Sequence, residues 1–273
     1  MKDLLKKKVA AVKDPGQKLN NLREGLQHLI LKILDDSGYF KMLSFVGGTS
    51  LRVVYDLRRF SEDVDFSLQT PDDPRFKFSN MLEDLKKYLA IYHFSIDTKT
   101  KQVGAVQNCF LRFKDILYEL GISPLKSEKL SIKLEVDTHP PAQARFQSHL
   151  IQKDFLFTLV HHDPSTLCAG KMLAFLFRSY TKGRDMYDLV WFLTKKTTVN
   201  KNFFENGLYQ ATGNKLSWSR DDLKRELLNR LESLDIQTAR KDAQPFLEDS
   251  AELRFFDKTL ILPLIENVDF DEL

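Results

Sequence analysis

The spacing of hydrophobic and polar positions along the chain changes near residue 160. Before that point, short apolar or alternating runs predict β-strands, because successive side chains of a strand point to opposite faces. Two of the expected strands lie within 93–118, on either side of a polar turn at 98–104. The other expected strands lie at 42–46, 63–68, 130–137 and 155–160.

Helical periodicity, with apolar residues three or four positions apart, marks most of the remaining chain. Helices are expected at 18–36, after the glycine pair at 47–48, and up to residue 92. From residue 165 onward the pattern is helical throughout, with helices expected at 165–180, 184–195, 200–210, 219–233 and 250–265. Strands come first and helices last, which predicts an α+β protein. We expect a mixed-sheet domain over 1–164 and a helical domain over 165–273.

The composition is that of a globular protein and excludes a disordered chain. Hydrophobic residues make up 42% of the sequence and charged residues 29%, and the 21 phenylalanines favour a packed core. The formal net charge is only +3, so the whole molecule has no strong attraction for nucleic acid. Only a local basic surface could supply such an attraction.

The cysteines and the absence of long apolar runs indicate a cytoplasmic protein. Cys109 and Cys168 are the only cysteines, which is too few for a disulfide framework, and they lack the spacing of zinc ligands. The first 16 residues contain no apolar core of the kind found in signal peptides. No run approaches the 18 or so apolar residues of a membrane span, so no membrane partner is expected.

Two aspartates interrupt the apolar run at 63–68. Residues two apart on a strand share a face, so Asp63 and Asp65 are expected to point the same way, opposite to Val64 and Phe66. Adjacent carboxylates repel each other, and a divalent cation such as Mg²⁺ removes the conflict. Pairs of such ions hold the attacking and leaving oxygens in phosphoryl displacement. A solvated sheet face is the alternative explanation for the same pattern.

A glycine turn precedes this strand. Gly47 and Gly48 end one apolar run and open a helix, which Thr49 or Ser50 is expected to cap. A helix start offers unpaired N–H groups and positive potential, and glycine lets a phosphate approach the backbone closely. The turn is neither a Walker A loop nor a dinucleotide fingerprint. A purely structural turn explains it equally well when it is taken alone.

A third carboxylate would complete a two-metal site. The alternating run at 130–137 places Lys133, Glu135 and Asp137 on one face of a strand. We choose Glu135 because it lies in the middle of the strand, while Asp137 stays the alternative. A charged stripe on an exposed sheet face would also produce this pattern.

These motifs together resemble the AbiEii/AbiGii toxin family of type IV toxin–antitoxin and abortive-infection systems. That family belongs to the nucleotidyltransferase superfamily with the DNA polymerase beta-like core. The third acid is Glu here rather than the commoner Asp, and the last 80 residues carry no signature of the family. The motifs cover 46–193, and the matching residues are Gly47, Gly48, Thr49, Leu51, Arg52, Arg59, Ser61, Asp63, Val64, Asp65, Phe66, Lys133, Leu134, Glu135, Lys171, Arg184, Asp185, Tyr187, Asp188 and Leu189.

The resemblance implies a fold and a reaction. The fold would be a polymerase beta-like nucleotidyltransferase domain followed by the helical domain. A nucleoside triphosphate (NTP) would bind with Mg²⁺ or Mn²⁺, an acceptor hydroxyl would attack its α-phosphorus, and pyrophosphate would leave. The implied acceptor is RNA, at the 3′ end of a tRNA, and a cognate antitoxin would oppose the toxin. A protein or small-molecule hydroxyl as acceptor, or a non-catalytic NTP-binding module, are the alternatives.

The resemblance also implies roles for individual residues. Asp63, Asp65 and Glu135 would hold the metal ions, and Glu135 would help to deprotonate the acceptor. Asp185 and Asp188 share a helix face, so capping and packing are an alternative role for them. The implied catalytic set is Asp63, Asp65, Glu135, Lys171, Asp185 and Asp188, and the implied nucleotide-binding set is Gly47, Gly48, Thr49, Ser50, Arg59 and Lys133.

Overall fold

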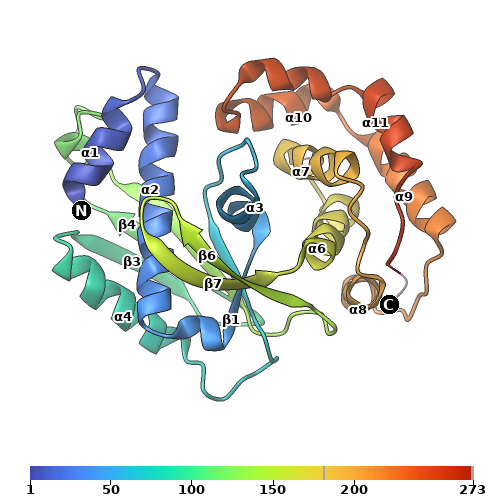
Figure 1. Cartoon of the computed structure of the whole chain (residues 1–273), viewed down its shortest axis with the longest axis horizontal. Helices are drawn as coiled ribbons and strands as arrows, with labels where there is room; N and C mark the ends of the chain where they lie inside the picture. The colour runs from blue at the N-terminus through green and yellow to red at the C-terminus, as the bar shows by residue number, and fades with distance from the viewer. Residues whose placement is uncertain (181, 272–273) are drawn as a thin grey trace. The chain divides into compact units, whose positions relative to one another are not determined.

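The chain forms two compact units in the computed structural model, which describes residues 1–180 and 182–271 (Figure 1). The first, here called the sheet unit, comprises Met1–Pro140 and Gln147–His161. The second, the helical unit, comprises Pro141–Phe146 and His162–Leu273. The predicted boundary at residue 164 stays a prediction. The sequence did not indicate that Pro141–Phe146, which precedes this boundary, belongs to the helical unit.

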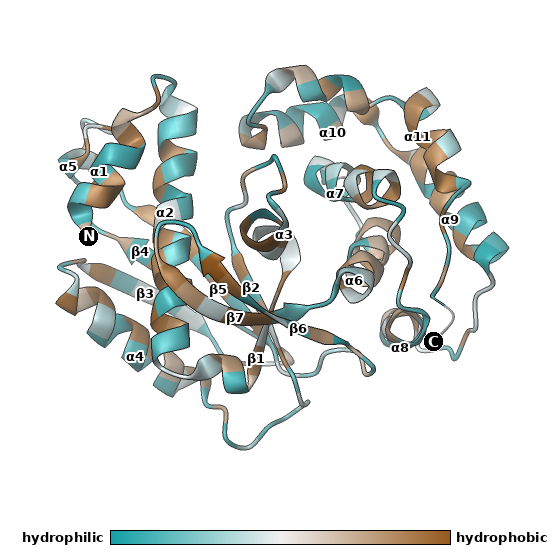
Figure 2. Cartoon of the chain, viewed as in Figure 1, coloured by the Kyte–Doolittle hydropathy of each residue, from teal (hydrophilic) through white to brown (hydrophobic). Residues whose placement is uncertain are grey.

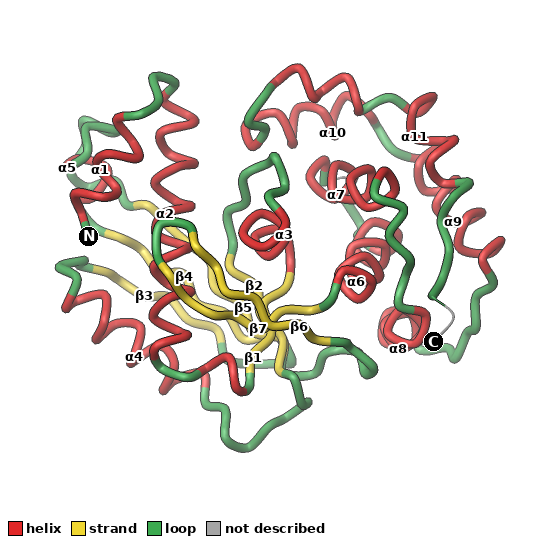
Figure 3. Tube along the Cα trace, viewed as in Figure 1, coloured by secondary structure: helices red, strands yellow, loops and turns green. Residues whose placement is uncertain are grey.

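A seven-stranded mixed sheet forms the centre of the sheet unit, with the strand order β3-β4-β5-β2-β1-β7-β6. Strand β2 pairs antiparallel with β1 and parallel with β5, so the sheet is mixed, as the α+β prediction required. Figure 3 shows these strands in yellow. Their bounds are β1 Leu43–Val46, β2 Val64–Leu68, β3 Ile96–Lys101, β4 Val106–Phe113, β5 Leu130–Asp137, β6 Phe146–Gln152 and β7 Leu156–His162.

Helix α2 is the longest helix of the sheet unit, and it packs on strand β5 and on helix α4. It carries both hydrophobic and hydrophilic positions in Figure 2, as expected for a helix with one buried face. Apolar side chains of β2 and β5, including Val64, Phe66 and Leu134, are almost completely buried. The helices are α1 Lys2–Ala10, α2 Pro15–Asp36, α3 Gly47–Tyr55, α4 Phe78–Ile91 and α5 Ile116–Glu119, with a 3₁₀ turn at Tyr39–Lys41.

Two edge strands differ from the sequence prediction. Strand β3 runs through most of the polar stretch 98–104 that was predicted as a turn, because an edge strand tolerates lysines on its exposed positions. Strand β6 was not predicted at all. Ile151 is its single well-buried side chain, so β6 lacks the apolar alternation that marks a strand.

The helical unit contains six α-helices in the described part of the chain. Helix α6 begins where Asp163 accepts a hydrogen bond from the Thr166 amide at 2.8 Å and Pro164 occupies its first turn. None of the described helices is both long and apolar enough to cross a membrane. The bounds are α6 Pro164–Phe177, α7 Gly183–Thr194, α8 Lys201–Thr212, α9 Arg220–Ser233, α10 Ile236–Ala243 and α11 Lys258–Ile265, with 3₁₀ turns at Gln244–Phe246 and Ser250–Phe255.

The single helix predicted over 250–265 is wrong. A 3₁₀ turn ends at Phe255, and α11 begins after Asp257, whose carboxylate accepts a hydrogen bond from the Thr259 amide at 2.8 Å. This N-cap starts a new helix, and the apolar periodicity continues across the break. Helix α10 was also missed, because its buried residues are the small Ala239 and Ala243.

A charged cluster ties α1 and α2 to the loop between β6 and β7. Lys8 Nζ lies 2.9 Å from Glu24 Oε2 and 2.7 Å from Asp154 Oδ2. His28 Nδ1 lies 2.7 Å from the same Asp154 oxygen. Burial alone would raise the pKa of Asp154, but the hydrogen bonds with His28 and Lys8 outweigh it and lower the pKa to about 2. The ionised carboxylate therefore stabilises the folded sheet unit.

We expect the Asp154→Asn variant to differ from the wild type in how its stability depends on pH. The pKa of Asp154 is lower in the folded protein than in the unfolded chain, where it is near 4. The carboxylate therefore contributes its full stabilisation above about pH 4 and loses it as the pH falls towards 2. The difference in free energy of unfolding between wild type and variant should therefore shrink by about 2 kcal/mol between about pH 5 and about pH 2. Urea denaturation across that range measures it.

Asp97→Asn is the matched control for this prediction. The pKa of Asp97 is also lowered to about 2, by hydrogen bonds from Lys114 and Lys129, but its side chain is 41% exposed. Exposed ion pairs contribute little because water and salt screen them. A difference that stays constant with pH for Asp154→Asn, or an equally large change for Asp97→Asn, would contradict the argument.

Candidate active site

The register of three strands places two of the predicted acids side by side. Asp65 of β2 is aligned with Glu135 of β5 and with Val46 of β1. Aligned residues on neighbouring strands point to the same face of a sheet, so Asp65 and Glu135 share a face. Val64 and Leu134, which are also aligned, are fully buried on the other face. Both acids are only partly buried, so a ligand can reach them.

Asp63 lies one residue before β2, which begins at Val64 instead of residue 63 as predicted. Its backbone carbonyl accepts a hydrogen bond from the Thr49 hydroxyl, which ties the start of β2 to α3. Its carboxylate lies close enough to Lys133 to influence the pKa of that side chain. Asp63 therefore belongs to the same cluster as Asp65 and Glu135.

Lys133 supplies positive charge to this acid cluster. Its Nζ lies 2.8 Å from Glu135 Oε1, and both side chains are between a quarter and a third exposed. Burial would lower the pKa of Lys133, but Glu135, Asp63 and Asp65 outweigh it and raise the pKa. Among the described residues no group of three or more His, Cys, Asp or Glu is gathered closely enough to hold a metal ion as it stands. The carboxylates nevertheless attract positive charge, as the ion pair between Lys133 and Glu135 shows.

Asp137 is placed differently from Glu135. It is aligned with Ser67, and its carboxylate accepts a hydrogen bond from the His139 amide at 2.9 Å. Burial raises the pKa of Asp137. Alignment with Asp65 thus favours Glu135 as the third acid, and the assignment stays a prediction.

Gly47 brings the start of α3 against the Asp65 side chain. Its φ of +77° lies in the left-handed region that favours glycine. A Cβ at this position would lie 2.3 Å from Asp65 Oδ2, so any side chain would displace that carboxylate. The first amides of a helix have no partners within the helix and carry the positive end of its dipole. Asp65 therefore lies beside a backbone surface suited to anions.

The other predicted nucleotide-binding residues around α3 are buried. The helix begins at Gly47 with Val46 as its N-cap residue, so the prediction that Thr49 or Ser50 caps it is wrong. Both hydroxyl residues lie within the first turn of the helix, as its third and fourth residues, and are inaccessible to solvent. Arg59 is 2% exposed, and a Cβ on Gly48 would lie 2.4 Å from its Nη2 atom. The Arg59 guanidinium thus packs directly beneath the glycine turn.

The helical unit holds the remaining predicted residues as two ion pairs. Lys171 Nζ of α6 lies 2.8 Å from Asp188 Oδ2 of α7. Arg178 Nη1 lies 3.0 Å from Asp185 Oδ2. Both aspartates are buried on one face of α7, one turn apart, as their spacing predicted. In this structure they join α7 to α6 and to the residue that follows it.

Sequence reasoning missed a concentration of cations around these pairs. Burial lowers the pKa of Lys182, and the neighbouring charges of Arg184, Arg178 and Lys171 lower it further, against the opposing effect of Asp185. The available signal was the recurrence of basic residues between 171 and 184. Four basic side chains therefore lie near one another in this unit, and two of them are paired with the buried aspartates of α7.

The predicted capping role of Asp185 is taken by another residue. Asp242 of α10 accepts a hydrogen bond from the Gly183 amide at 2.8 Å, and its Oδ2 lies 3.4 Å from the Arg184 amide. These are the first two amides of α7, so a neighbouring helix caps it. Asp185 is left to pair with Arg178.

Comparison with protein families decides the class of the protein. The family model of the nucleotidyl transferase AbiEii toxin, from type IV toxin–antitoxin systems, matches residues 29–261. The chain belongs to this family. The resemblance inferred from the motifs is therefore confirmed, and AbiEii membership makes the chain a nucleotidyltransferase of a toxin–antitoxin system. The matched range includes the acid cluster and both buried aspartates of α7.

Three solved structures resemble this AbiEii-family chain. A protein from H. pylori described as a nucleotidyltransferase is 20% identical, with a TM-score of 0.48, over 88% of this chain and 95% of that one. JHP933 from Helicobacter pylori is 19% identical, with a TM-score of 0.47, over 88% and 92%. An antigenic nucleotidyltransferase-like protein from Paracoccidioides brasiliensis is 17% identical, with a TM-score of 0.42, over 85% and 95%. A comparison with curated proteins found no match.

Proposed function

We propose that this AbiEii-family chain is a Mg²⁺-dependent nucleotidyltransferase that moves a nucleotidyl group from an NTP to an RNA hydroxyl. The proposed acceptor is the 3′ end of a tRNA. The observation that carries the proposal is the alignment of Asp65 with Glu135 beside the glycine that opens α3. A polymerase beta-like core for the sheet unit is part of the same proposal.

The donor set suits a hard divalent cation. Asp63, Asp65 and Glu135 offer carboxylate oxygens, which Mg²⁺ and Mn²⁺ prefer, and a cationic side chain already lies among them. The chemistry supplied by the bound ion is neutralisation of charge at the transferred phosphoryl group. The Gly47 and Gly48 amides would orient phosphate oxygens at the start of α3. Glu135 would accept the proton of the attacking hydroxyl.

Other parts of the proposal concern partners and location. A cognate antitoxin fits the type IV toxin–antitoxin family, and a cytoplasmic location stays a prediction. Catalytic roles for Lys171, Asp185 and Asp188 also stay predictions. Each of these side chains takes part in one of the two ion pairs described above. Transfer to a protein or small-molecule hydroxyl, or NTP binding without transfer, are outcomes that the experiment separates.

The test supplies the purified protein with Mg²⁺, total tRNA and each α-labelled NTP in turn. Label on tRNA with one nucleotide, absent for Asp63→Asn, is the expected result and identifies the donor. Label on protein instead would favour the alternative acceptor. NTP binding with no transfer at all would favour the non-catalytic module.

We expect the Lys133→Met variant to bind Mn²⁺ several-fold to about tenfold more tightly than the wild type in the absence of nucleotide. The Lys133 ammonium competes with a metal ion for the same carboxylates, and methionine removes that competitor while keeping a long side chain. Electron paramagnetic resonance of free Mn²⁺ measures the affinity. Lys129→Met is the control, because Lys129 precedes the same strand and pairs with Asp97. Unchanged or weaker Mn²⁺ binding by Lys133→Met would contradict this prediction.

A further inference from the structure

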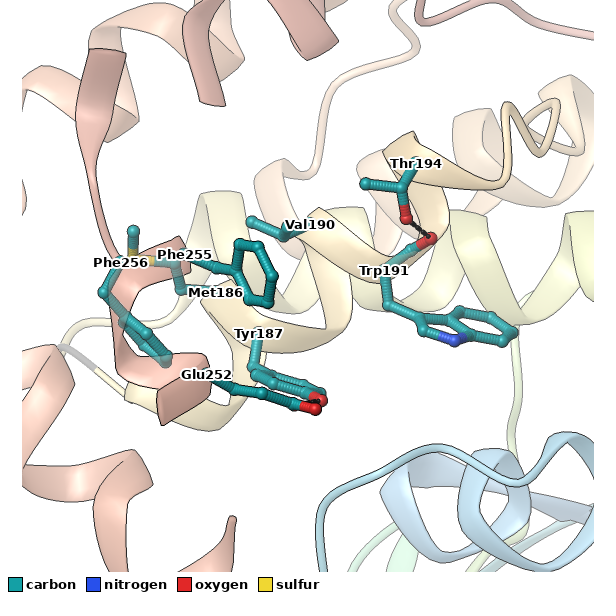
Figure 4. A pocket seen from close by; sticks show the side chains of 8 residues that line it. All are labelled: Met186, Tyr187, Val190, Trp191, Thr194, Glu252, Phe255 and Phe256. Carbon is teal, nitrogen blue, oxygen red and sulfur yellow. Dashed lines mark hydrogen bonds between the residues drawn. The ribbon is translucent and has the colours of Figure 1, made fainter. Parts of the chain in front are cut away.

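A cavity of about 190 Å³ lies within the helical unit, between α7 and the residues around 252–256 (Figure 4). The predicted chemistry does not use it. Tyr187 and Trp191 project into it from α7, and Phe255 and Phe256 from the facing segment. The complete lining is Met186, Tyr187, Val190, Trp191, Thr194, Glu252, Phe255 and Phe256.

Four of the eight residues that line the cavity are aromatic. Phe256 and Met186 are 2% and 1% exposed and form the buried apolar part of the lining, whereas Phe255 is 38% exposed. Flat aromatic surfaces favour stacking of a planar ring system. Sites that enclose drug-sized ligands measure about 300–1,000 Å³, so this smaller cavity suits a single ring system and excludes a whole nucleoside triphosphate.

One buried carboxylate marks the polar end of the cavity. Glu252 is 7% exposed and accepts a hydrogen bond from the Tyr187 hydroxyl. A carboxylate has about four lone-pair sites, so one carboxylate can accept from a ligand as well as from a tyrosine hydroxyl. The Thr194 hydroxyl donates to the Trp191 carbonyl at 2.8 Å and does not turn to the cavity. The cavity therefore favours a planar ligand that donates N–H groups at one edge.

Positive charge lies at the opening. The Arg254 guanidinium carbon is 4.9 Å from the centre of the Phe255 ring, and the Arg254 side chain is exposed. Sites for single-stranded nucleic acid combine positive charge along the backbone with aromatic side chains on which the bases stack. The aromatic side chains suit the flat face of a base, and the Glu252 carboxylate suits its hydrogen-bonding edge. The Arg254 guanidinium suits the phosphate of the backbone.

We propose that this cavity binds an unpaired guanine base of the acceptor RNA, with Glu252 accepting hydrogen bonds from the guanine N1–H and 2-amino groups. Guanine alone among the four bases presents two adjacent N–H donors at its Watson–Crick edge, which a carboxylate accepts together. The inference rests on the proposed function in one respect, namely that the acceptor is RNA. The choice of guanine rests on the side chains of the cavity and not on the proposed function.

The test uses tryptophan fluorescence and short RNAs. The chain has two tryptophans, so the Trp218→Phe variant leaves Trp191, on the cavity wall, as the single reporter. The trinucleotide r(UGU) should quench it. Binding of r(UIU), which lacks the 2-amino group, and of r(UAU) should be about tenfold weaker or more, the discrimination given by a bidentate contact.

Further variants assign the contacts. Glu252→Gln should remove the preference for guanine, while Glu248→Gln, at an exposed position four residues earlier, should retain it. Arg254→Gln should weaken r(UGU) without changing the weaker binding of free guanosine. Tighter binding of guanosine monophosphate than of r(UGU) would overturn the assignment to RNA.

The result is distinguishable from failure of the proposed function. The guanine site would be overturned if r(UGU) gave no quenching. It would also be overturned if r(UGU), r(UIU) and r(UAU) quenched equally, or if Glu252→Gln left the preference unchanged. Each of these results would count even if tRNA is labelled in the transfer assay. Guanine-selective quenching with no transfer to tRNA would instead leave the cavity assigned and remove the proposed reaction.

Discussion

The Asp65→Asn variant is expected to lose nucleotidyl transfer by at least about 10²–10³-fold, the cost of removing one charge-stabilising group from a reaction centre. Asparagine keeps the shape of the side chain but removes the negative charge that would hold the metal ion. The strand register makes Asp65 the central acid, since it is aligned with Glu135 and lies against the Gly47 backbone. Initial rates with the labelled NTP identified for the wild type measure the loss.

Asp65→Asn should leave the fold intact, because the side chain is only partly buried and its strand is held by the apolar residues on the opposite face. Its urea midpoint should lie close to that of the wild type. Asp56→Asn is the matched control. The Asp56 side chain is 78% exposed at the other end of α3, and its φ of 55° suits asparagine. Full activity in Asp65→Asn, or equal loss in both variants, would remove the acid cluster from the reaction.

The acid cluster was largely predictable from the sequence because strand alternation is a local property. An aspartate on each side of Val64 already placed two carboxylates on one face, and the run at 130–137 did the same for Glu135. The register between β2 and β5 could not be predicted in this way, because the two strands are far apart in the sequence. Only the pairing of the strands shows that Asp65 is aligned with Glu135 and that Asp137 lies two residues further along β5.

Burial was the part of the site that the sequence could not supply. A threonine or serine after a glycine turn reads equally well as a cap or as a phosphate contact. In the structure Thr49 and Ser50 lie buried in the first turn of α3, and the Thr49 hydroxyl donates a hydrogen bond to the Asp63 carbonyl. Their position depends on where α3 begins, and the left-handed φ of Gly47 sets that start.

Helix α10 could not be predicted from the sequence either, because it packs through small residues. Sequence periodicity detects large apolar side chains, whereas α10 buries two alanines and approaches α7 backbone to backbone at Gly183. Asp242 then caps α7 across a separation of nearly 60 residues in the sequence. Neither relation leaves a local pattern, and both depend on one glycine.

The Gly183→Ala variant is expected to destabilise the helical unit by about 3 kcal/mol or more, at the upper end of overpacking effects. A Cβ on Gly183 would lie 1.9 Å from the Ala239 carbonyl oxygen and 3.1 Å from the Ala243 amide nitrogen. These are backbone atoms of a helix, so relief requires α10 to move away from α7. That movement also breaks the hydrogen bond from the Gly183 amide to Asp242.

Tryptophan fluorescence during urea denaturation measures this effect in the right unit, because Trp191 and Trp218 both belong to the helical unit. Gly170→Ala is the matched control within α6. A Cβ there meets only Phe203 Cε1 at 3.9 Å, an ordinary contact. Alanine is favoured over glycine in a helix interior by about 1 kcal/mol, so Gly170→Ala should be neutral or stabilising. If Gly183→Ala instead unfolds at the same urea concentration as Gly170→Ala, the close approach of α10 to α7 is not what holds the helical unit together.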